Sequence, residues 1–461
     1  MFTEAPRPTS IRQHRNAGWF AVATVCFGAF MGQLDASIVT LTFPALQREF
    51  AAPLAAVEWV SLTYLLALVG LLAAAGRLAD AAGRKLMYLY GFAVFTAASV
   101  ACGLAPGLGW LLGFRVVQAV GAAMLQANSV ALVVTSVAPE KRRAALGVQA
   151  AAQALGLAMG PALGGILVNT VGWRWVFLVN LPVGILGIVA GRFLLPRTQD
   201  RTPVGRFDGA GLVLLAVASS TLLLTLSGVS GLGLPANVVV LLAVAAVAAT
   251  WAFGKREQRA ANPLVSLAVL RPAPVSFGLI GALCGYLVLF GPLTLFPQVL
   301  GTTDSVGLIL TCLPAGFALA ALTAERVLPR RIGPRGRAML GAAAAAVACA
   351  ALAFQPKPAV LVGALLFLLG LGLGVFIPAN NSSIMDAVPE RMSAMGGGLV
   401  SMARGLGTAF GVAVVTLFLH AGGKTTGAVG AFVAFVVFAA IAGATALAAG
   451  EPSNQQYELS L

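Results

Sequence analysis

Charged residues are scarce in this sequence. Only 10% of its 461 residues are Asp, Glu, Lys or Arg, whereas 59% are hydrophobic and the mean hydropathy is +0.93. A soluble domain carries about 25% charged residues, so this composition excludes an ordinary soluble protein. It predicts an all-α membrane protein that crosses the bilayer many times and lies in the cell membrane.

Histidine and paired cysteine are lacking as well. The two histidines, His14 and His420, lie outside the apolar runs, and the five cysteines show no paired spacing. We therefore expect no metal site, no buried histidine relay and no cofactor, and we interpret the cysteines as small apolar side chains. No paired acid and base faces one interface, so the sequence does not indicate an enzyme.

The net charge of +14 is spread over short loops rather than gathered in one patch. This distribution argues against nucleic acid as a partner and instead orients the chain in the membrane. With a cytoplasmic N-terminus, nearly all basic loop residues are cytoplasmic. The few on the outer side are Arg48, Arg174, Lys357 and Lys424. The positive-inside rule then predicts cytoplasmic termini and an even number of spans.

Apolar runs of about 18–25 residues can each cross a bilayer as a helix, and we count fourteen. The first is too long for the apolar region of a signal peptide, so we expect it to remain as the first span. The predicted spans are 18–43, 57–75, 86–105, 109–135, 144–168, 173–194, 209–230, 236–253, 275–298, 305–327, 338–355, 359–385, 393–419 and 427–449.

An internal repeat divides these spans into two units. The segments that start at Pro139 and Pro389 align at a constant offset of 251, which places Gly156 on Gly407. Duplicated halves of a membrane bundle indicate a transporter with a path between them. We predict a six-helix bundle over 1–195, a linker with two inserted spans over 196–273, a second six-helix bundle over 274–450 and a cytoplasmic tail over 451–461.

One acid, Asp35, lies well inside a span, in the stretch GQLDASIVTLTFP. A charge there costs several kcal/mol, so Asp35 is a candidate proton carrier. Arg115 lies near the outer end of the fourth span, as Asp35 does in the first, so the two side chains could meet. A purely structural Asp35, bonded to a neighbouring helix, is the alternative. The other acids near spans lie at span ends: Glu58, Asp304, Glu325 and Asp386.

Polar side chains form stripes on single helix faces of the fourth, fifth and thirteenth spans. Because polar groups find no partner in hydrocarbon, these faces must look into the protein or a wet cavity. The candidate substrate-cavity residues are Tyr64, Gln118, Gln126, Gln149, Gln153, Asn380 and Arg404.

Glycine marks two further segments. Gly156, Gly160 and Gly164 share one face of the fifth span with Pro161 nearby, which allows close approach of another helix. Packing alone and a moving interface both remain open as roles for this face. The loop GRLADAAGRK, between the second and third spans, has basic residues around one acid. The acid in this loop is Asp80.

These motifs resemble those of the major facilitator superfamily. GRLADAAGRK is similar to its loop between spans 2 and 3, RVVQAVGAAM to its span-4 motif, and ALGLAMGPALGGIL to the span-5 motif of its antiporters. The Asp35 stretch resembles the span-1 motif of the fourteen-span drug:proton antiporter branch, with Thr40 and Thr42 in place of the usual Asn and Ala.

The resemblance implies two six-helix bundles that rock about a central site, with the proton gradient as the energy source. It also implies that Gly76, Asp80, Gly83 and Arg84 form a cytoplasmic gate. It further implies proton-coupled export of lipophilic drugs or antibiotics by alternating access, with protons and membrane lipids as the other partners. We expect a monomer. The alternative is an exporter or flippase of one endogenous lipid or natural product.

Overall fold

The computed structural model describes residue 4 and residues 6–138, 141–198, 208–229, 231–260, 267–300, 304–329, 331–355, 358–388 and 393–448. The predicted tail, 451–461, lies outside these ranges. Within them the secondary structure is helical throughout, and thirteen helices are long and apolar enough to cross a membrane. The prediction of an all-α membrane fold is confirmed.

The first six spans pack around one hydrophobic core. Helix α2 packs against α7, α8 and α10, while α7 also contacts α5 and α6. The helices of this half are α1 (Thr9–Arg12), α2 (Ala17–Ile38), α3 (Phe43–Phe50), α4 (Leu54–Val57), α5 (Trp59–Ala82), α6 (Arg84–Gly103), α7 (Leu108–Ser136), α8 (Arg142–Thr170), α9 (Arg174–Leu178) and α10 (Asn180–Leu194).

The first predicted span, 18–43, lies within the candidate membrane span Ala17–Phe50, but its outer end is not α-helical, because α2 stops at Ile38 and a 3₁₀ turn, η1 (Val39–Thr42), follows. The hydroxyls of Thr40 and Thr42 each donate to the carbonyl three residues earlier, at 3.1 and 2.6 Å. Such local bonds compete with the regular α-helical ladder. The two threonines that depart from the family motif therefore shape this turn.

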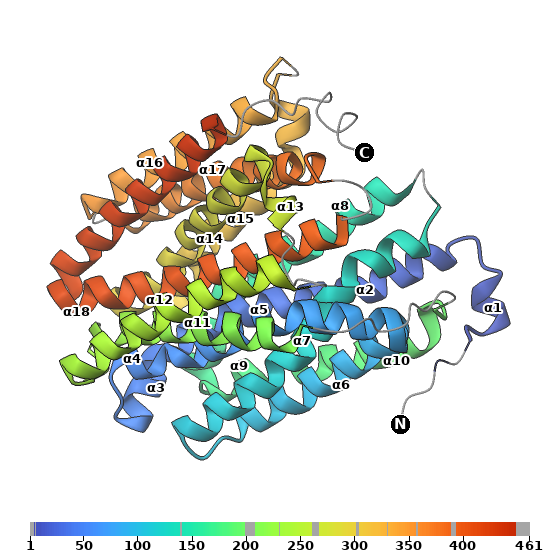
Figure 1. The fold of residues 1–461 in the computed structure, drawn as a ribbon, viewed down its shortest axis with the longest axis horizontal. Helices are drawn as coiled ribbons and strands as arrows, with labels where there is room; N and C mark the ends of the chain where they lie inside the picture. The colour runs from blue at the N-terminus through green and yellow to red at the C-terminus, as the bar shows by residue number, and fades with distance from the viewer. Residues whose placement is uncertain are drawn as a thin grey trace.

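Two inserted helices, α11 (Gly209–Val229) and α12 (Ala236–Arg259), pair with each other between the halves of the chain. Figure 1 shows them in green and yellow-green, beside the orange part of α18. Helix α11 contacts α4 and α5 of the first half and α18 of the second. The insertion is thus in contact with both halves.

The second half is built around its own hydrophobic core. Its last helix, α18, covers 56 residues, which is roughly 80 Å of helix against a bilayer core of about 30 Å. The chain leaves helical geometry at Gly423, where φ is 64°, so α18 contains two spans and the described residues hold fourteen. The helices are α13 (Leu267–Leu270), α14 (Ala273–Leu300), α15 (Asp304–Val327), α16 (Pro334–Ala353), α17 (Ala359–Asp386) and α18 (Ser393–Ala448).

The repeat seen in the sequence recurs in the packing. A Cβ atom on Gly156 of α8 would collide with the Phe30 carbonyl of α2, and one on Gly407 of α18 with the Leu283 carbonyl of α14. Helix pairs α2–α8 and α14–α18 are therefore equivalent, each joined by glycines that let two backbones approach closely.

The two halves meet through α8 with α15, α5 with α18, and η1 with α14. The Thr40 hydroxyl lies 3.3 Å from the Leu293 carbonyl oxygen of α14. A Cβ atom on Gly307 of α15 would lie 2.8 Å from the Pro161 carbonyl oxygen of α8. Residues 40, 293 and 307 all belong to the outer ends of their helices, so the outer parts of the halves are packed together.

Candidate functional site: a buried ion pair at the interface of the halves

Asp35 and Arg115 form a buried ion pair. The Arg115 Nη1 atom donates to Asp35 Oδ2 at 2.7 Å, and the side chains are 1% and 0% exposed for Arg115 and Asp35. Arg115 lies about two turns from the start of α7 and Asp35 lies in the last turn of α2, so helix direction alone puts both near the outer end of the first bundle. The pair balances its charges inside a membrane, where either charge alone would be costly.

Amide side chains complete the shell around the Asp35 carboxylate. Gln118 Nε2 donates to Asp35 Oδ1 at 3.0 Å and to Ser99 Oγ at 2.7 Å, while its Oε1 accepts from Arg115 at 2.6 Å. Asn180, at the start of α10, donates to Asp35 Oδ1 at 3.4 Å. Four helices, α2, α6, α7 and α10, thus fix the carboxylate in place.

Arg115 is held on its other side by α5. Its Nε atom donates to the Val60 carbonyl at 2.8 Å, and its guanidinium carbon lies 4.1 Å from the centroid of the Tyr64 ring. A cation over an aromatic face is stabilised by the ring quadrupole. A change in the charge of Asp35 would therefore alter the contacts of Arg115 with α5, and α5 packs against α18 of the second half.

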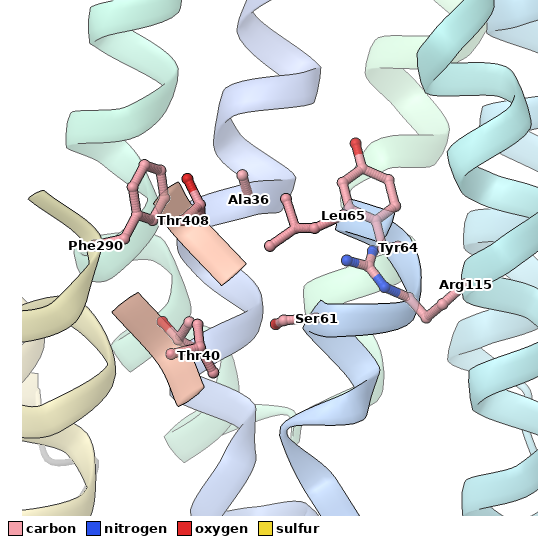
Figure 2. Close-up of a pocket in the computed structure, with 9 residues that line it drawn as sticks. Ala36, Thr40, Ser61, Tyr64, Leu65, Arg115, Phe290 and Thr408 are labelled. Atoms are coloured by element: carbon pink, nitrogen blue, oxygen red, sulfur yellow. The ribbon is translucent and has the colours of Figure 1, made fainter. Parts of the chain in front are cut away.

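A small cavity connects this cluster to the interface between the halves (Figure 2). Its volume of about 10 Å³ is close to what one water molecule needs. The Ser61 hydroxyl points into it, and both Ser61 Oγ and Tyr64 Oη are buried without a hydrogen-bond partner. The walls come from both halves: Ala36, Thr40, Ser61, Tyr64, Leu65 and Arg115 from the first, and Phe290, Thr408 and Val412 from the second.

The predicted substrate-cavity residues divide into separate groups. Tyr64 and Gln118 belong to the ion-pair cluster. Deeper in the membrane, Arg404 Nη2 of α18 donates to Gln126 Oε1 of α7 at 2.8 Å, which bridges the halves, and both side chains are half-buried. These two residues, on facing helices of the two halves, remain candidates for a substrate contact.

The other candidates make contacts within one half. The Gln149 amide is hydrogen-bonded to the Ser129 hydroxyl, the Gln153 side chain is half-buried, and Asn380 Nδ2 donates to the Gly278 carbonyl at 2.8 Å. The Asn380 amide therefore joins α17 to α14.

The span-5 glycine motif lies between the halves. A Cβ atom on Gly160 would collide with the Ser37 hydroxyl of α2, and one on Gly164 would lie 2.9 Å from Ile38 Cγ1. On the same helix, the Pro161 carbonyl faces Gly307 of the second half. The motif therefore packs tightly on α2 and presents a backbone surface to α15.

The gate loop contains one unusual backbone position. Gly83 ends α5 with φ at 112°, a conformation that glycine adopts without strain. Gly76 lies within α5, and a Cβ atom added to it would lie at an ordinary contact distance from Ala127. Arg84 starts α6, and the side chain of Asp80 lies outside the described part of the structure.

Sequence reasoning missed Lys85 in this loop and Glu58 at the outer end of α5. Lys85 is fully buried, and its Nζ donates to the Arg192 and Leu195 carbonyls at 2.9 Å each, which caps the end of α10. Glu58 is also fully buried. Its position directly before Trp59 marks it as a span-end residue, and nothing in the sequence signals that another helix covers it.

Comparison with known proteins agrees with this architecture. A sequence profile described as Major Facilitator Superfamily matches residues 25–412 and 275–456. The chain belongs to this superfamily. It is therefore a multi-pass transporter of the cell membrane rather than an enzyme.

Curated relatives of this major facilitator protein include named exporters. The tetracenomycin C resistance and export protein of Streptomyces glaucescens is 31% identical, over 88% of this chain and 76% of the relative. Multidrug resistance protein Stp of Mycobacterium tuberculosis is 32% identical, over 86% of this chain and 74% of the relative. These relatives confirm the predicted resemblance to the drug-export branch.

A different name also occurs among similar proteins. The riboflavin transporter RibZ of Clostridioides difficile is 28% identical, over 87% of this chain and 88% of the relative. Among solved structures, an inward-facing, occupied bacterial homolog of the human lysosomal transporter Spinster superposes with a TM-score of 0.63 at 17% identity, covering 95% of this chain and 98% of that one. At this identity the superposition supports the fold alone.

Proposed function

We propose that this protein is a proton-coupled antiporter that exports lipophilic drugs or antibiotics by alternating access. The observation that carries the proposal is the buried Asp35–Arg115 pair, placed beside a cavity whose walls come from both halves. A proton carrier must bind its proton on one side of the membrane and release it on the other, which requires a buried acid whose surroundings change as the halves move.

The contacts of the Asp35–Arg115 ion pair would change when Asp35 binds a proton. With Asp35 ionised, Arg115 holds the carboxylate, Gln118 and Tyr64 in one cluster. A proton on Asp35 removes the negative charge and leaves Arg115 bonded to neutral groups only, so the cluster loses its main Coulomb attraction. Because Arg115 is bonded to Val60 of α5, and α5 packs on α18, this change is transmitted to the interface between the halves.

The substrate class follows from the charges that face the interface. Arg115 and Arg404 are the buried or half-buried cations there, and Asp35 is already paired. Such a lining is unfavourable for a dication. We therefore expect neutral, zwitterionic or monovalent lipophilic molecules, with rings such as Tyr64 and Phe290 available for stacking.

The decisive experiment compares uphill export by the native protein and by Asp35→Asn in proteoliposomes with an imposed pH gradient. We expect Asp35→Asn to reach the membrane and to exchange substrate down its gradient, but to lose uphill export. The control is Asp386→Asn, which alters an exposed acid at the end of α17 and should export normally. Uphill export by Asp35→Asn at the native rate would disprove the coupling role.

Export of one natural product or lipid is the second candidate, favoured by the relative that is named for tetracenomycin C. A panel of unrelated lipophilic drugs separates the two proposals. Resistance to several of them in an expressing strain, abolished by an uncoupler, supports multidrug export, whereas resistance or transport confined to one compound supports the second candidate.

A further inference from the structure

Glu58 is a buried carboxyl that the proposed coupling mechanism does not use. It lies between α4 and α5, and its side chain is 0% exposed. Three elements from different parts of the fold meet around it, since α4 and α5 both contact the inserted helix α11 and the C-terminal helix α18. An acid at a membrane helix end could reach water at the outer surface, so its complete burial requires an explanation.

The surroundings of Glu58 can hold a neutral carboxylic acid, and its complete burial favours that form over a carboxylate. Ser227 Oγ of α11 donates to Glu58 Oε1 at 2.5 Å, while Oε2 is buried without a hydrogen-bond partner. The Thr416 hydroxyl of α18 lies against the carboxyl, but it donates its own proton to the Val412 carbonyl at 3.2 Å. While the Thr416 hydroxyl donates to Val412, its oxygen can accept a hydrogen bond, and a protonated Oε2 would supply that donor.

Among the residues that the structure describes, no ion pair involves Glu58. Ser227 of α11 and Thr416 of α18 are its polar neighbours, and neither is ionisable. On α5 and the helices around it, Arg115 is paired with Asp35, and Arg404 is bonded to Gln126.

One further titratable group lies near the junction. His420, one helical turn beyond Thr416 on α18, is exposed and lies against Gly231, after α11. It serves below as a control for the pH dependence.

We propose that Glu58 is a second proton-binding site, on the outer side, whose proton must be bound before the outer face of the transporter closes. Burial disfavours the ionised form of an unpaired carboxyl, so the carboxylate favours any state in which water reaches it. Opening the outer face separates α5 from α11 and α18 and exposes Glu58. Protons outside then shift the population toward the closed state because they bind the open state at Glu58 and remain bound as it closes.

This inference rests on the proposed function only in taking external protons as the coupling ion. It assigns a role to the inserted helix as well, because Ser227 of α11 donates the hydrogen bond that holds the carboxyl in place. Along α5, Ser61 follows Glu58 by one turn and lines the cavity next to Arg115. Glu58 therefore lies on the outer side of the interface between the halves, one helical turn from the cavity beside the Asp35 cluster.

The test measures the outer opening directly. Spin labels are attached to Arg48→Cys on α3 and Lys424→Cys on α18, both exposed outer positions on opposite halves, with the native cysteines replaced. Distances between the labels are recorded in nanodiscs across a pH series, without substrate. We expect a short distance at low pH, a longer one at high pH, and a transition that follows the uptake of one proton.

In Glu58→Gln the pH-dependent transition should be lost and the short distance should persist. A glutamine reproduces the neutral acid, since its carbonyl can accept from Ser227 and its amide can donate to Thr416. His420→Asn and Asp386→Asn, which alters an exposed acid at the end of α17, should each keep the transition. Glu58→Ala, which removes the group altogether, should also abolish it, and this guards against an effect peculiar to glutamine.

Two results overturn the proposal: a transition in Glu58→Gln equal to that of the native protein, or loss of the transition in His420→Asn. Uphill export by Asp35→Asn at the native rate would disprove the coupling role of Asp35, whereas the comparison of Glu58→Gln with the native protein tests Glu58 alone, so the two failures are distinguishable.

Discussion

Replacement of Arg115 by methionine gives the sharpest test of how the ion pair contributes to stability. Arg115→Met removes a buried cation and leaves Asp35, 0% exposed, with only the Gln118 and Asn180 amides as donors. Breaking a buried pair by removing one partner costs about 3–5 kcal/mol. The remaining amide donors place the expected loss near 3 kcal/mol, about a hundredfold in the unfolding equilibrium.

The measurement is a double-mutant cycle, in which unfolding is followed in mixed micelles with a denaturing detergent. Arg115→Met/Asp35→Asn should be more stable than Arg115→Met alone, because the uncompensated charge is gone. The deficit of the single variant should also shrink at low pH, where the lone carboxyl is neutral. Arg174→Met is the control, since its pair with Glu49 is 40% and 39% exposed and should contribute at most about 1 kcal/mol.

Two outcomes would refute the reasoning. The first is an Arg115→Met variant as stable as the native protein at neutral pH. The second is a double variant whose loss equals the sum of the two single losses, which would mean that Asp35 and Arg115 do not interact.

Two further predictions concern packing. Gly307→Ala places a Cβ atom 2.8 Å from the Pro161 carbonyl oxygen, so it should hold the outer ends of α8 and α15 apart and sharply reduce export at normal expression. The control is Gly397→Ala, whose added Cβ atom would have no neighbour within 4 Å and which should export normally. Lys85→Met leaves two carbonyls at the end of α10 without their donor and should lower the free energy of unfolding by about 2 kcal/mol. In the same unfolding assay in mixed micelles, Lys141→Met, which alters an exposed side chain, should have no measurable effect.

The sequence predicts the Asp35 cluster better than it predicts the rest of the interior. Helix direction and loop charges place Asp35 and Arg115 at the same depth, and the structure brings them to 2.7 Å. Gln118 is predicted to line the substrate cavity, but both ends of its amide are bonded within the cluster. A polar stripe shows which helix face is buried, but not which neighbouring helix supplies the partner.

Composition and periodicity by themselves determined that the chain is a helical membrane protein, how often it crosses the bilayer, which way it is oriented and that its halves are duplicated. These properties depend on the length and polarity of local segments, which a bilayer constrains strongly. Only the tertiary structure decided that Glu58 is buried. The residues that bury it, Ser227 and Thr416, are far away in the sequence and come from helices whose apolar surfaces give no sign of their partners.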